Sequence, residues 1–157
     1  MMALVLVLAL GGVDSLAKQT LQGLVFKGPT QWEKQEGDAN TLSWKTTDGE
    51  AEMAVSVYEW DKPRPTSGCL KPMLEALGSE GFTVTTMATN PAAKKVTTDY
   101  LGEEGAEKTD ANKVTTTTVI GCSGKIRWVL TWSAKTSEGA RFGPILKRVL
   151  ESISYGK

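Results

Sequence analysis

The sequence predicts an α+β domain in which a mainly antiparallel β-sheet is flanked by two amphipathic helices. Several short segments alternate polar and apolar residues, which is the period-two pattern of a half-buried strand. Two longer segments, residues 68–77 and 142–153, instead carry apolar residues at the spacing of one helix face. Runs of strands combined with two such helices are typical of α+β domains.

Length and composition restrict the classes of protein to which the chain can belong. Its 157 residues suit a single domain, and its 18 basic and 18 acidic residues lack the basic excess of a nucleic-acid-binding protein. The absence of histidine excludes Ser-His-Asp and Cys-His catalytic systems and His-ligated metal centres. The sequence contains no phosphate-binding glycine motif, so we expect no cofactor.

The N-terminus predicts export. Residues 3–10 form an unbroken apolar run that is too short to span a bilayer but fits the apolar region of a signal peptide. The small residues Ser15 and Ala17 predict a signal peptide of residues 1–17. Cleavage would leave residues 18–157 as one periplasmic or secreted domain with no transmembrane span. The alternative is that the apolar run is a buried strand or helix of the domain.

The cysteine content agrees with export. Cys69 and Cys122 are the only two cysteines, and an even pair in an exported protein is more often a disulfide than a reactive site. We therefore expect a Cys69–Cys122 bridge. The alternative is two separate buried thiols that act as small apolar side chains.

The N-terminal half predicts strands. Residues 18–23 are polar and are expected to form a short tether before a strand at residues 24–26. Residues 41–45 and 51–60 are expected to form the two arms of a hairpin, joined by the turn residues Thr47, Asp48 and Gly49. Both faces of residues 51–60 carry bulky side chains, so this strand is expected at the centre of the sheet with a covering layer on each side.

The middle of the chain contains the first predicted helix. Apolar residues of 68–77 fall on one helical stripe, and Pro72 is expected in or near the first turn. Strands are then expected at residues 82–86 and 94–101. Residues 102–112 are acidic and poor in apolar side chains, which indicates a solvated loop.

The strongest strand pattern lies in the C-terminal third. Residues 114–122 and 125–133 both alternate with a period of two and flank a Ser-Gly turn, which predicts a long hairpin.

A second helix is expected to close the chain. Residues 142–153 form one apolar stripe, and Thr136 or Ser137 can cap the helix. Pro144 lies inside this pattern and predicts either a kink or a helix that begins near Gly143.

Three groups of residues are candidates for sites of chemistry. The acidic residues of the expected loop are Glu103, Glu104, Glu107 and Asp110. Their spacing lacks the alternating oxygen ligands of a calcium loop, which favours a solvated segment. Ser123 and Lys125 are a formal Ser-Lys pair, but their place at a hairpin turn favours a surface role. Paired carboxylates for glycoside hydrolysis stay open, because their separation is a spatial quantity.

The tryptophans are candidates both for the core and for contacts. Alternating strand positions, which predict packing, are held by Trp44, Trp128 and Trp132. Trp32 and Trp60 instead lie beside predicted loops, and Trp60 precedes a proline-containing break with Arg64. Aromatic and arginine side chains near a stiff loop are typical of interface hot spots. We therefore expect Trp32, Trp60 and Arg64 to be partner contacts, with packing as an equal alternative for Trp60.

The order of the elements also resembles a known family. It runs through an entry segment from Gly28 to Trp32, a hairpin about residues 47–49, a mid-chain helix leading into Phe82-Thr83-Val84, a long hairpin and a closing helix. This resembles the PsbP/Mog-like α/β/α sandwich, including small bacterial envelope proteins of the DcrB type, over residues 24–154. The resemblance implies an adaptor, assembly or partner-binding module rather than an enzyme, with no catalytic residue to carry over. The chain differs from lipoprotein members because it has no cysteine after the leader.

Together these observations predict a non-catalytic exported binding or assembly module of the cell envelope, with a protein as its partner. One alternative is a small-ligand carrier, whose pocket we expect on the face of Trp128 and Trp132. The other is a hydrolase that uses carboxylates or a Ser-Lys pair.

Overall fold

The computed structural model describes residues 15–63, 66–85, 103–123 and 125–155, and at some positions within these ranges only the backbone. The strands are β1 (Leu16–Leu21), β2 (Leu24–Pro29), β3 (Glu33–Gln35), β4 (Thr41–Lys45), β5 (Ala51–Glu59), β6 (Thr83–Thr85), β7 (Glu103–Thr109), β8 (Val114–Ser123), β9 (Ile126–Lys135) and β10 (Ser154–Tyr155). The helices are α1 (Thr66–Ser79), the short 3-10 helix η2 (Thr136–Glu138) and α2 (Gly139–Glu151).

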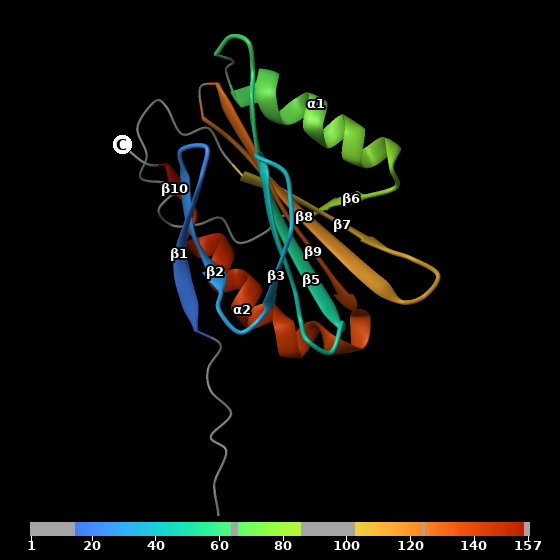
Figure 1. The fold of residues 1–157 in the computed structure, drawn as a ribbon. Helices are drawn as coiled ribbons and strands as arrows, with labels where there is room; N and C mark the ends of the chain where they lie inside the picture. The colour runs from blue at the N-terminus through green and yellow to red at the C-terminus, as the bar shows by residue number, and fades with distance from the viewer. Residues whose placement is uncertain (1–14, 64–65, 86–102, 124, 156–157) are drawn as a thin grey trace, which may run out of the picture.

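The strands form two antiparallel sheets. The large sheet has seven strands in the order β3-β4-β5-β9-β8-β7-β6, and the small sheet has the order β1-β2-β10. The expected hairpins β4–β5 and β8–β9 are both present, with Met53 opposite Trp44 and Val119 opposite Leu130. The α+β fold class predicted from the sequence is therefore confirmed, with its two helices and its mainly antiparallel sheet (Figure 1).

Strand alternation gives the large sheet two different faces. One face, here called the α2 face, carries Val55, Val57, Trp128 and Leu130, which are all fully buried. It packs against α2 and the small sheet in the main core, where Phe26 meets Trp44 edge to face with ring centroids 5.9 Å apart. The opposite face, here called the α1 face, carries side chains such as Ile120 and contacts α1.

The two helices cover the two faces unequally. Five apolar residues of α2 are buried in the main core, namely Phe142, Ile145, Leu146, Val149 and Leu150. Burial of each such side chain stabilises the fold by roughly 1.5–3 kcal/mol. Helix α1 packs against β8, β7 and β6, where Leu70 joins Ile120 and Cys122 in a second, smaller cluster. The expected covering layer on both sides of β5 is therefore present on its α2 face, whereas on its α1 face Ala54 and Ser56 are only half-buried.

The N-terminal prediction of a polar tether is wrong. Residues 16–21 form β1, which pairs with β2 along its whole length, from Leu16 opposite Pro29 to Leu21 opposite Leu24. The polar residues Lys18 and Thr20 occur in β1 because it is an edge strand whose outer side chains are exposed. Cleavage after Ala17 stays a prediction, and it would remove the first two residues of this strand.

Three local predictions around β7 and the helices are also wrong. Residues 103–109 are strand β7 rather than a solvated loop, because β8 supplies a complete set of backbone partners. Pro72 lies in the second turn of α1, since the helix starts at Thr66 rather than at residue 68. Neither Thr136 nor Ser137 caps α2, because both belong to η2 and Thr136 instead donates its hydroxyl hydrogen bond to the Lys113 carbonyl at 2.9 Å.

The closing helix begins before its proline. Helix α2 starts at Gly139, so Pro144 lies inside it and the expected start near Gly143 is wrong. The strand expected at residues 94–101 lies outside the described residues. Within the residues that the structure describes, neither helix is long and apolar enough to cross a membrane.

Candidate functional site

A cleft of about 570 Å³ lies between α2 and the α2 face of β7, β8 and β9, and is here called the α2 cleft. Its apolar wall is formed by Trp132, Ala134, Phe142, Leu146 and Leu150. Volumes of about 300–1,000 Å³ are usual for binding sites of small ligands or partner side chains. The α2 cleft therefore has both the size and the lining of a binding site.

Two glycines open this cleft on its helical side. Gly139, Gly143 and Lys147 follow one another at intervals of four residues on α2. They therefore lie on the same side of the helix, and all three line the cleft. A Cβ atom added to either glycine would meet no other atom within 4 Å. The missing side chains leave the backbone of α2 bare where a guest group could lie against it.

The sheet side of the α2 cleft is lined by threonine hydroxyl groups that bond to one another. The hydroxyls of Thr109 and Thr115 lie 2.9 Å apart, and those of Thr115 and Thr136 lie 2.8 Å apart. Thr117 donates a hydrogen bond of 3.2 Å to the Glu107 carboxylate. These hydroxyl groups are hydrogen-bonded within the protein. They would therefore keep their partners if an apolar group entered the cleft.

Two lysines stand at the rim of the α2 cleft. Lys135 is paired with Glu50, with its Nζ 2.8 Å from a carboxylate oxygen, and this hydrogen bond raises the pKa of Lys135. Lys147 is exposed and its Nζ lies 3.8 Å from a Glu151 oxygen, one turn along the same helix. An apolar floor with a charged, solvated rim is the usual composition of a protein interface.

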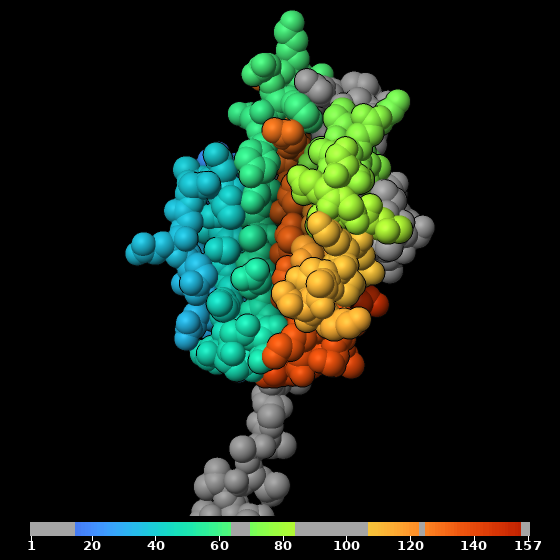
Figure 2. Space-filling view, turned by 90° about the vertical axis from the view of Figure 1, so that its right-hand side faces the viewer, coloured from blue at the N-terminus to red at the C-terminus, as the bar shows by residue number. Residues whose placement is uncertain are grey.

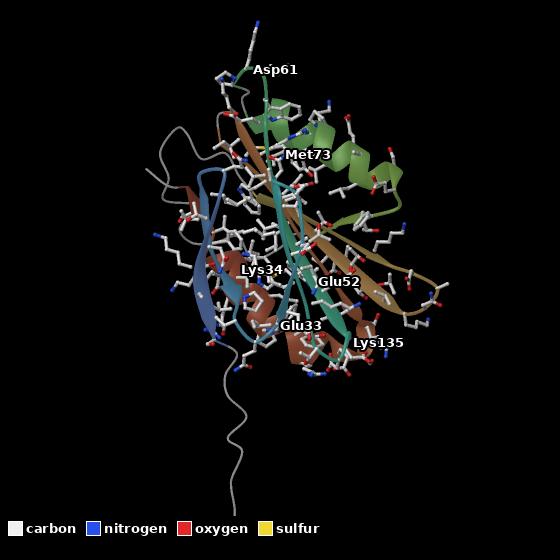
Figure 3. The ribbon with its side chains drawn as sticks, viewed as in Figure 1. Glu33, Lys34, Glu52, Asp61, Met73 and Lys135 are labelled. Atoms are coloured by element: carbon white, nitrogen blue, oxygen red, sulfur yellow. The ribbon has the colours of Figure 1, made fainter. Side chains whose placement is uncertain are left out.

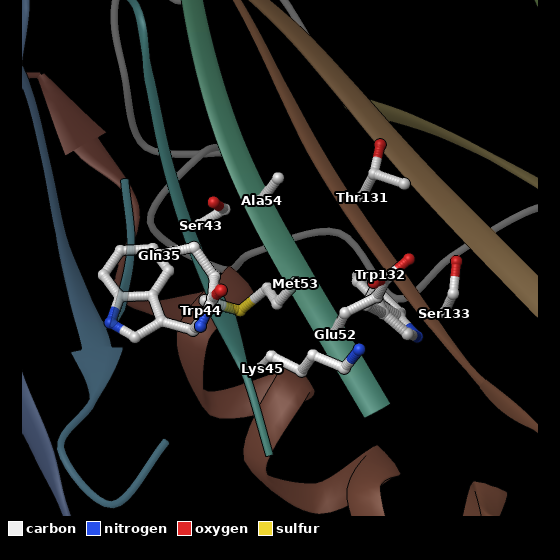
Figure 4. Close-up of a pocket in the computed structure, with 10 residues that line it drawn as sticks. All are labelled: Gln35, Ser43, Trp44, Lys45, Glu52, Met53, Ala54, Thr131, Trp132 and Ser133. Atoms are coloured by element: carbon white, nitrogen blue, oxygen red, sulfur yellow. The ribbon is translucent and has the colours of Figure 1, made fainter. Parts of the chain in front are cut away.

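A second hollow, of about 380 Å³, lies on the α1 face over β3, β4, β5 and β9 and is here called the hydroxyl hollow. Four strands contribute to it, and its polar side chains include the exposed Gln35 and Lys45 and the half-buried Ser43, Thr131 and Ser133 (Figure 4). Figure 2 shows this face, with β9 in orange between the teal of β5 and the green and yellow of α1 and β7. Cross-strand hydroxyl pairs span the sheet here, as between Thr131 and Thr118 at 3.2 Å. The hydroxyl hollow is smaller than the α2 cleft, at about 380 Å³ against about 570 Å³.

The three predicted partner contacts, Trp32, Trp60 and Arg64, differ in how far they are buried and described. Trp32 is only 7% exposed and packs edge to face on Phe142, with ring centroids 5.7 Å apart, which leaves it little surface for a partner. Trp60 is half-buried against the cluster beneath α1. Arg64 lies outside the described residues.

A different arginine lies beside Trp60. The guanidinium carbon of Arg127 is 4.0 Å from the centre of the Trp60 ring and 5.1 Å from that of Tyr58. Sequence reasoning missed Arg127, because its place beside these rings depends on the pairing of β5 with β9, in which Tyr58 stands opposite Arg127. The alternation of residues 125–133 could have placed it on the face opposite Trp128.

The remaining candidates fall into two groups. Trp44 and Trp128 are buried in the main core, and Trp132 packs against it at the α2 cleft, which confirms their predicted packing role. The expected Cys69–Cys122 bridge stays a prediction, because Cys122 is fully buried but the side chain of Cys69 is not described. The side chains of Ser123, Glu103 and Glu104 are likewise outside the description. The Asp110 carboxylate accepts hydrogen bonds from the backbone N–H groups of residues 112 and 114.

Comparisons with known proteins bear on the fold. No protein-family model and no curated protein matches the chain. Among solved structures, a crystal structure of a Bacteroides thetaiotaomicron protein is similar, with a TM-score of 0.56 and 11% sequence identity over 86% of this chain and 46% of that one. The solution structure of cyanobacterial PsbP (CyanoP) from Synechocystis has a TM-score of 0.47 and 10% identity over 92% of this chain and 94% of that one. The first likeness shows a shared fold, in which this chain spans about half the length of the Bacteroides protein. The likeness to CyanoP is too low to support a conclusion about this chain.

Proposed function

We propose that this chain is a non-catalytic binding module of the cell envelope, and that the α2 cleft receives an apolar segment of a partner protein. The observation that carries the proposal is the bare helix surface at Gly139 and Gly143, which faces an apolar wall that includes Trp132. A cleft that is lined by apolar side chains and carries a few polar groups is the usual form of a binding site.

The shape of the α2 cleft favours a protein segment as its occupant. It lies along α2 over two helical turns, from Gly139 to Lys147, and it opens at a rim of threonines and charged groups. Protein interfaces combine an apolar centre with such a polar rim. A peptide segment with one or two apolar side chains would match both parts.

The cell envelope is proposed from the N-terminal sequence. The apolar run of residues 3–10 supports export to the periplasm or the medium. We also propose the finer fold assignment, a PsbP/Mog-like α/β/α sandwich. It is supported by the packing of α1 and α2 against opposite faces of the large sheet.

A small-ligand carrier is the second candidate function. The volume of about 570 Å³ and the presence of Trp132 in the wall match what that function requires. Trp128, the other residue of that face, is fully buried and does not line the α2 cleft. The open side of the cleft favours a protein segment over an enclosed small molecule.

Site-specific photo-crosslinking tests the proposed function. A benzophenone amino acid replaces Lys147 at the rim of the α2 cleft, or Lys27 on β2 as an exposed control outside it, in the cells that make the protein. We expect a discrete protein adduct from position 147 and none from position 27. Equal adducts from both positions, or none from position 147 in any cell fraction, would contradict the proposal. A small-molecule adduct at 147 would support the carrier function instead.

A further inference from the structure

Arg127 is held between two aromatic rings on the α1 face. Its guanidinium carbon lies 4.0 Å from the Trp60 ring centre and 5.1 Å from that of Tyr58, so both rings offer their electron-rich faces to the cation. Trp60 itself packs against the cluster that contains Leu70 and Cys122, which fixes its position. The arginine is therefore oriented before any partner arrives.

The positive charge of Arg127 is not balanced by a carboxylate. Among the described residues Arg127 forms no ion pair, and its Nε is buried without a hydrogen-bond partner. Arg141, by comparison, pairs with both Asp48 at 2.9 Å and Glu138 at 3.4 Å. Because the buried Nε–H has no partner, the guanidinium charge is incompletely satisfied within the fold, and a carboxylate that pairs with the terminal Nη groups would stabilise it.

We propose that Arg127, with Tyr58 and Trp60, binds a carboxylate group of a protein partner. Stacking occupies the flat faces of a guanidinium and leaves its N–H edge free to pair with a planar carboxylate in a bidentate manner. Tyr58 is 40% exposed and adds an aromatic surface beside the charge. Tyrosine, tryptophan and arginine are the side chains that dominate protein-interface hot spots.

The shape of the guanidinium favours a carboxylate over a phosphate. Exposed charges of both signs surround Trp60, namely Glu59, Asp61, Lys62 and Lys125, and Figure 3 shows Asp61 at the end of the molecule beside the start of α1. One planar guanidinium matches the single charge and the planar geometry of one carboxylate. The site goes beyond the proposed α2 cleft, because it lies on the opposite face of the large sheet.

Nuclear magnetic resonance provides the test. The full chain is titrated at low salt with the peptide acetyl-Ser-Glu-Ser-Glu-Ser-amide, and the Arg127 Nε–H signal is followed directly. We expect a saturable shift of that signal with a dissociation constant of about 1 mM or tighter, and no shift with the matching glutamine peptide. The backbone N–H signals of Tyr58 and Val129 give the affinity of variants. Arg127→Lys keeps the charge but loses the fork of donors, and is expected to weaken binding at least about 10-fold.

Two control variants test whether binding depends on Arg127 itself, rather than on the overall positive charge of the protein or on the α2 cleft. Lys27→Gln removes one exposed positive charge elsewhere and should leave the affinity unchanged. Gly143→Leu, which fills the α2 cleft, should also leave it unchanged, so failure of one proposal is distinguishable from failure of the other. No shift of the Arg127 Nε–H signal, an equal shift with the glutamine peptide, or tighter binding of inorganic phosphate would each overturn the proposal. The wild-type signal gives this answer even if the Arg127 variant does not fold.

Discussion

Gly121 and Trp128 lie directly opposite each other on β8 and β9, and the indole ring fills the space that a side chain at position 121 would need. A Cβ atom added at Gly121 would overlap the indole ring of Trp128. Trp128 is fully buried, so its ring has no free space into which it can move. This pair sets the packing of the two longest strands.

Gly121→Ala is therefore expected to destabilise the protein strongly. Overpacking of a closed core costs about 1–3 kcal/mol, and the backbone of β8 must shift to relieve this clash, so we expect about 3 kcal/mol. Urea unfolding followed by tryptophan fluorescence measures the change. Gly78→Ala on α1 is the control: a Cβ there meets nothing within 4 Å, and alanine raises helix stability by up to about 1 kcal/mol. An unchanged unfolding midpoint for Gly121→Ala would contradict this packing.

The contact between the β4–β5 turn and α2 is expected to depend on pH. Hydrogen bonding from Thr46, then from the Glu50 backbone N–H and from Arg141, lowers the pKa of Asp48 from 3.8 to about 2. A lowered folded-state pKa stabilises the fold above the unfolded value, and this contribution is lost as the pH falls from about 4 to about 2. Asp48→Asn should therefore lower the melting temperature at pH 6, with a difference that shrinks toward pH 2.

The size of this effect is limited by exposure. The side chains of Asp48 and Arg141 are 42% and 55% exposed, so the difference should be small and should decrease further in high salt. Glu36→Gln removes an exposed carboxylate elsewhere and serves as the control. A difference between Asp48→Asn and wild type that stays constant from pH 6 to pH 2 would be inconsistent with the lowered pKa.

The Cys69–Cys122 bridge is testable by mass. Cys122 is fully buried beneath α1, no cysteine among the described residues is a free thiol, and Cys69 is the only other cysteine of the chain. We expect no alkylation of the unfolded protein until a reductant is added. Replacement of both cysteines by alanine should then cost about 4 kcal/mol in the chain-entropy model for a loop of this length. Two thiols that alkylate without reductant would show instead that they are separate buried side chains.

The first residues of β1 are expected to contribute to stability. Leu16 packs partly against the main core and stands opposite Pro29. A chain that starts at Ser15 should therefore be more stable than one that starts at Lys18, by about 1 kcal/mol for the half-buried leucine. Paired urea titrations measure this difference. Equal stability of the two chains would mean that Leu16 and Ala17 contribute nothing to the fold, which would agree with cleavage after Ala17.

Elements with a clear periodicity could be predicted from the sequence, whereas the polar strands β1 and β7 could not. The long hairpin β8–β9 and the stripe of α2 follow from alternation and helical spacing alone. Strands β1 and β7 carry polar or acidic residues at many of their positions, so their sequences resemble loops. Their strand character comes from backbone partners that are supplied by β2 and β8, which no local pattern can show.

The candidate site was predictable only in part. The spacing of Gly139 and Gly143 on a predicted helix could have indicated a bare surface, and the alternation of β9 indicated the face of Trp132. The α2 cleft itself depends on how α2 lies across β9 and β8, which is a tertiary property. The stacking of Arg127 on Tyr58 likewise depends on a strand pairing between residues 69 positions apart (127 − 58).

The most direct test of the central claim fills the α2 cleft and measures the loss of the partner. Gly143→Leu places a side chain in the cleft on an open, helical position, and Gly78→Leu makes the same change on α1 as a matched control. Both are combined with the photo-crosslinker at position 147. The account predicts that Gly143→Leu abolishes the adduct, while Gly78→Leu leaves its yield unchanged. An adduct that persists at full yield in folded Gly143→Leu protein would contradict the claim that the α2 cleft is the binding surface.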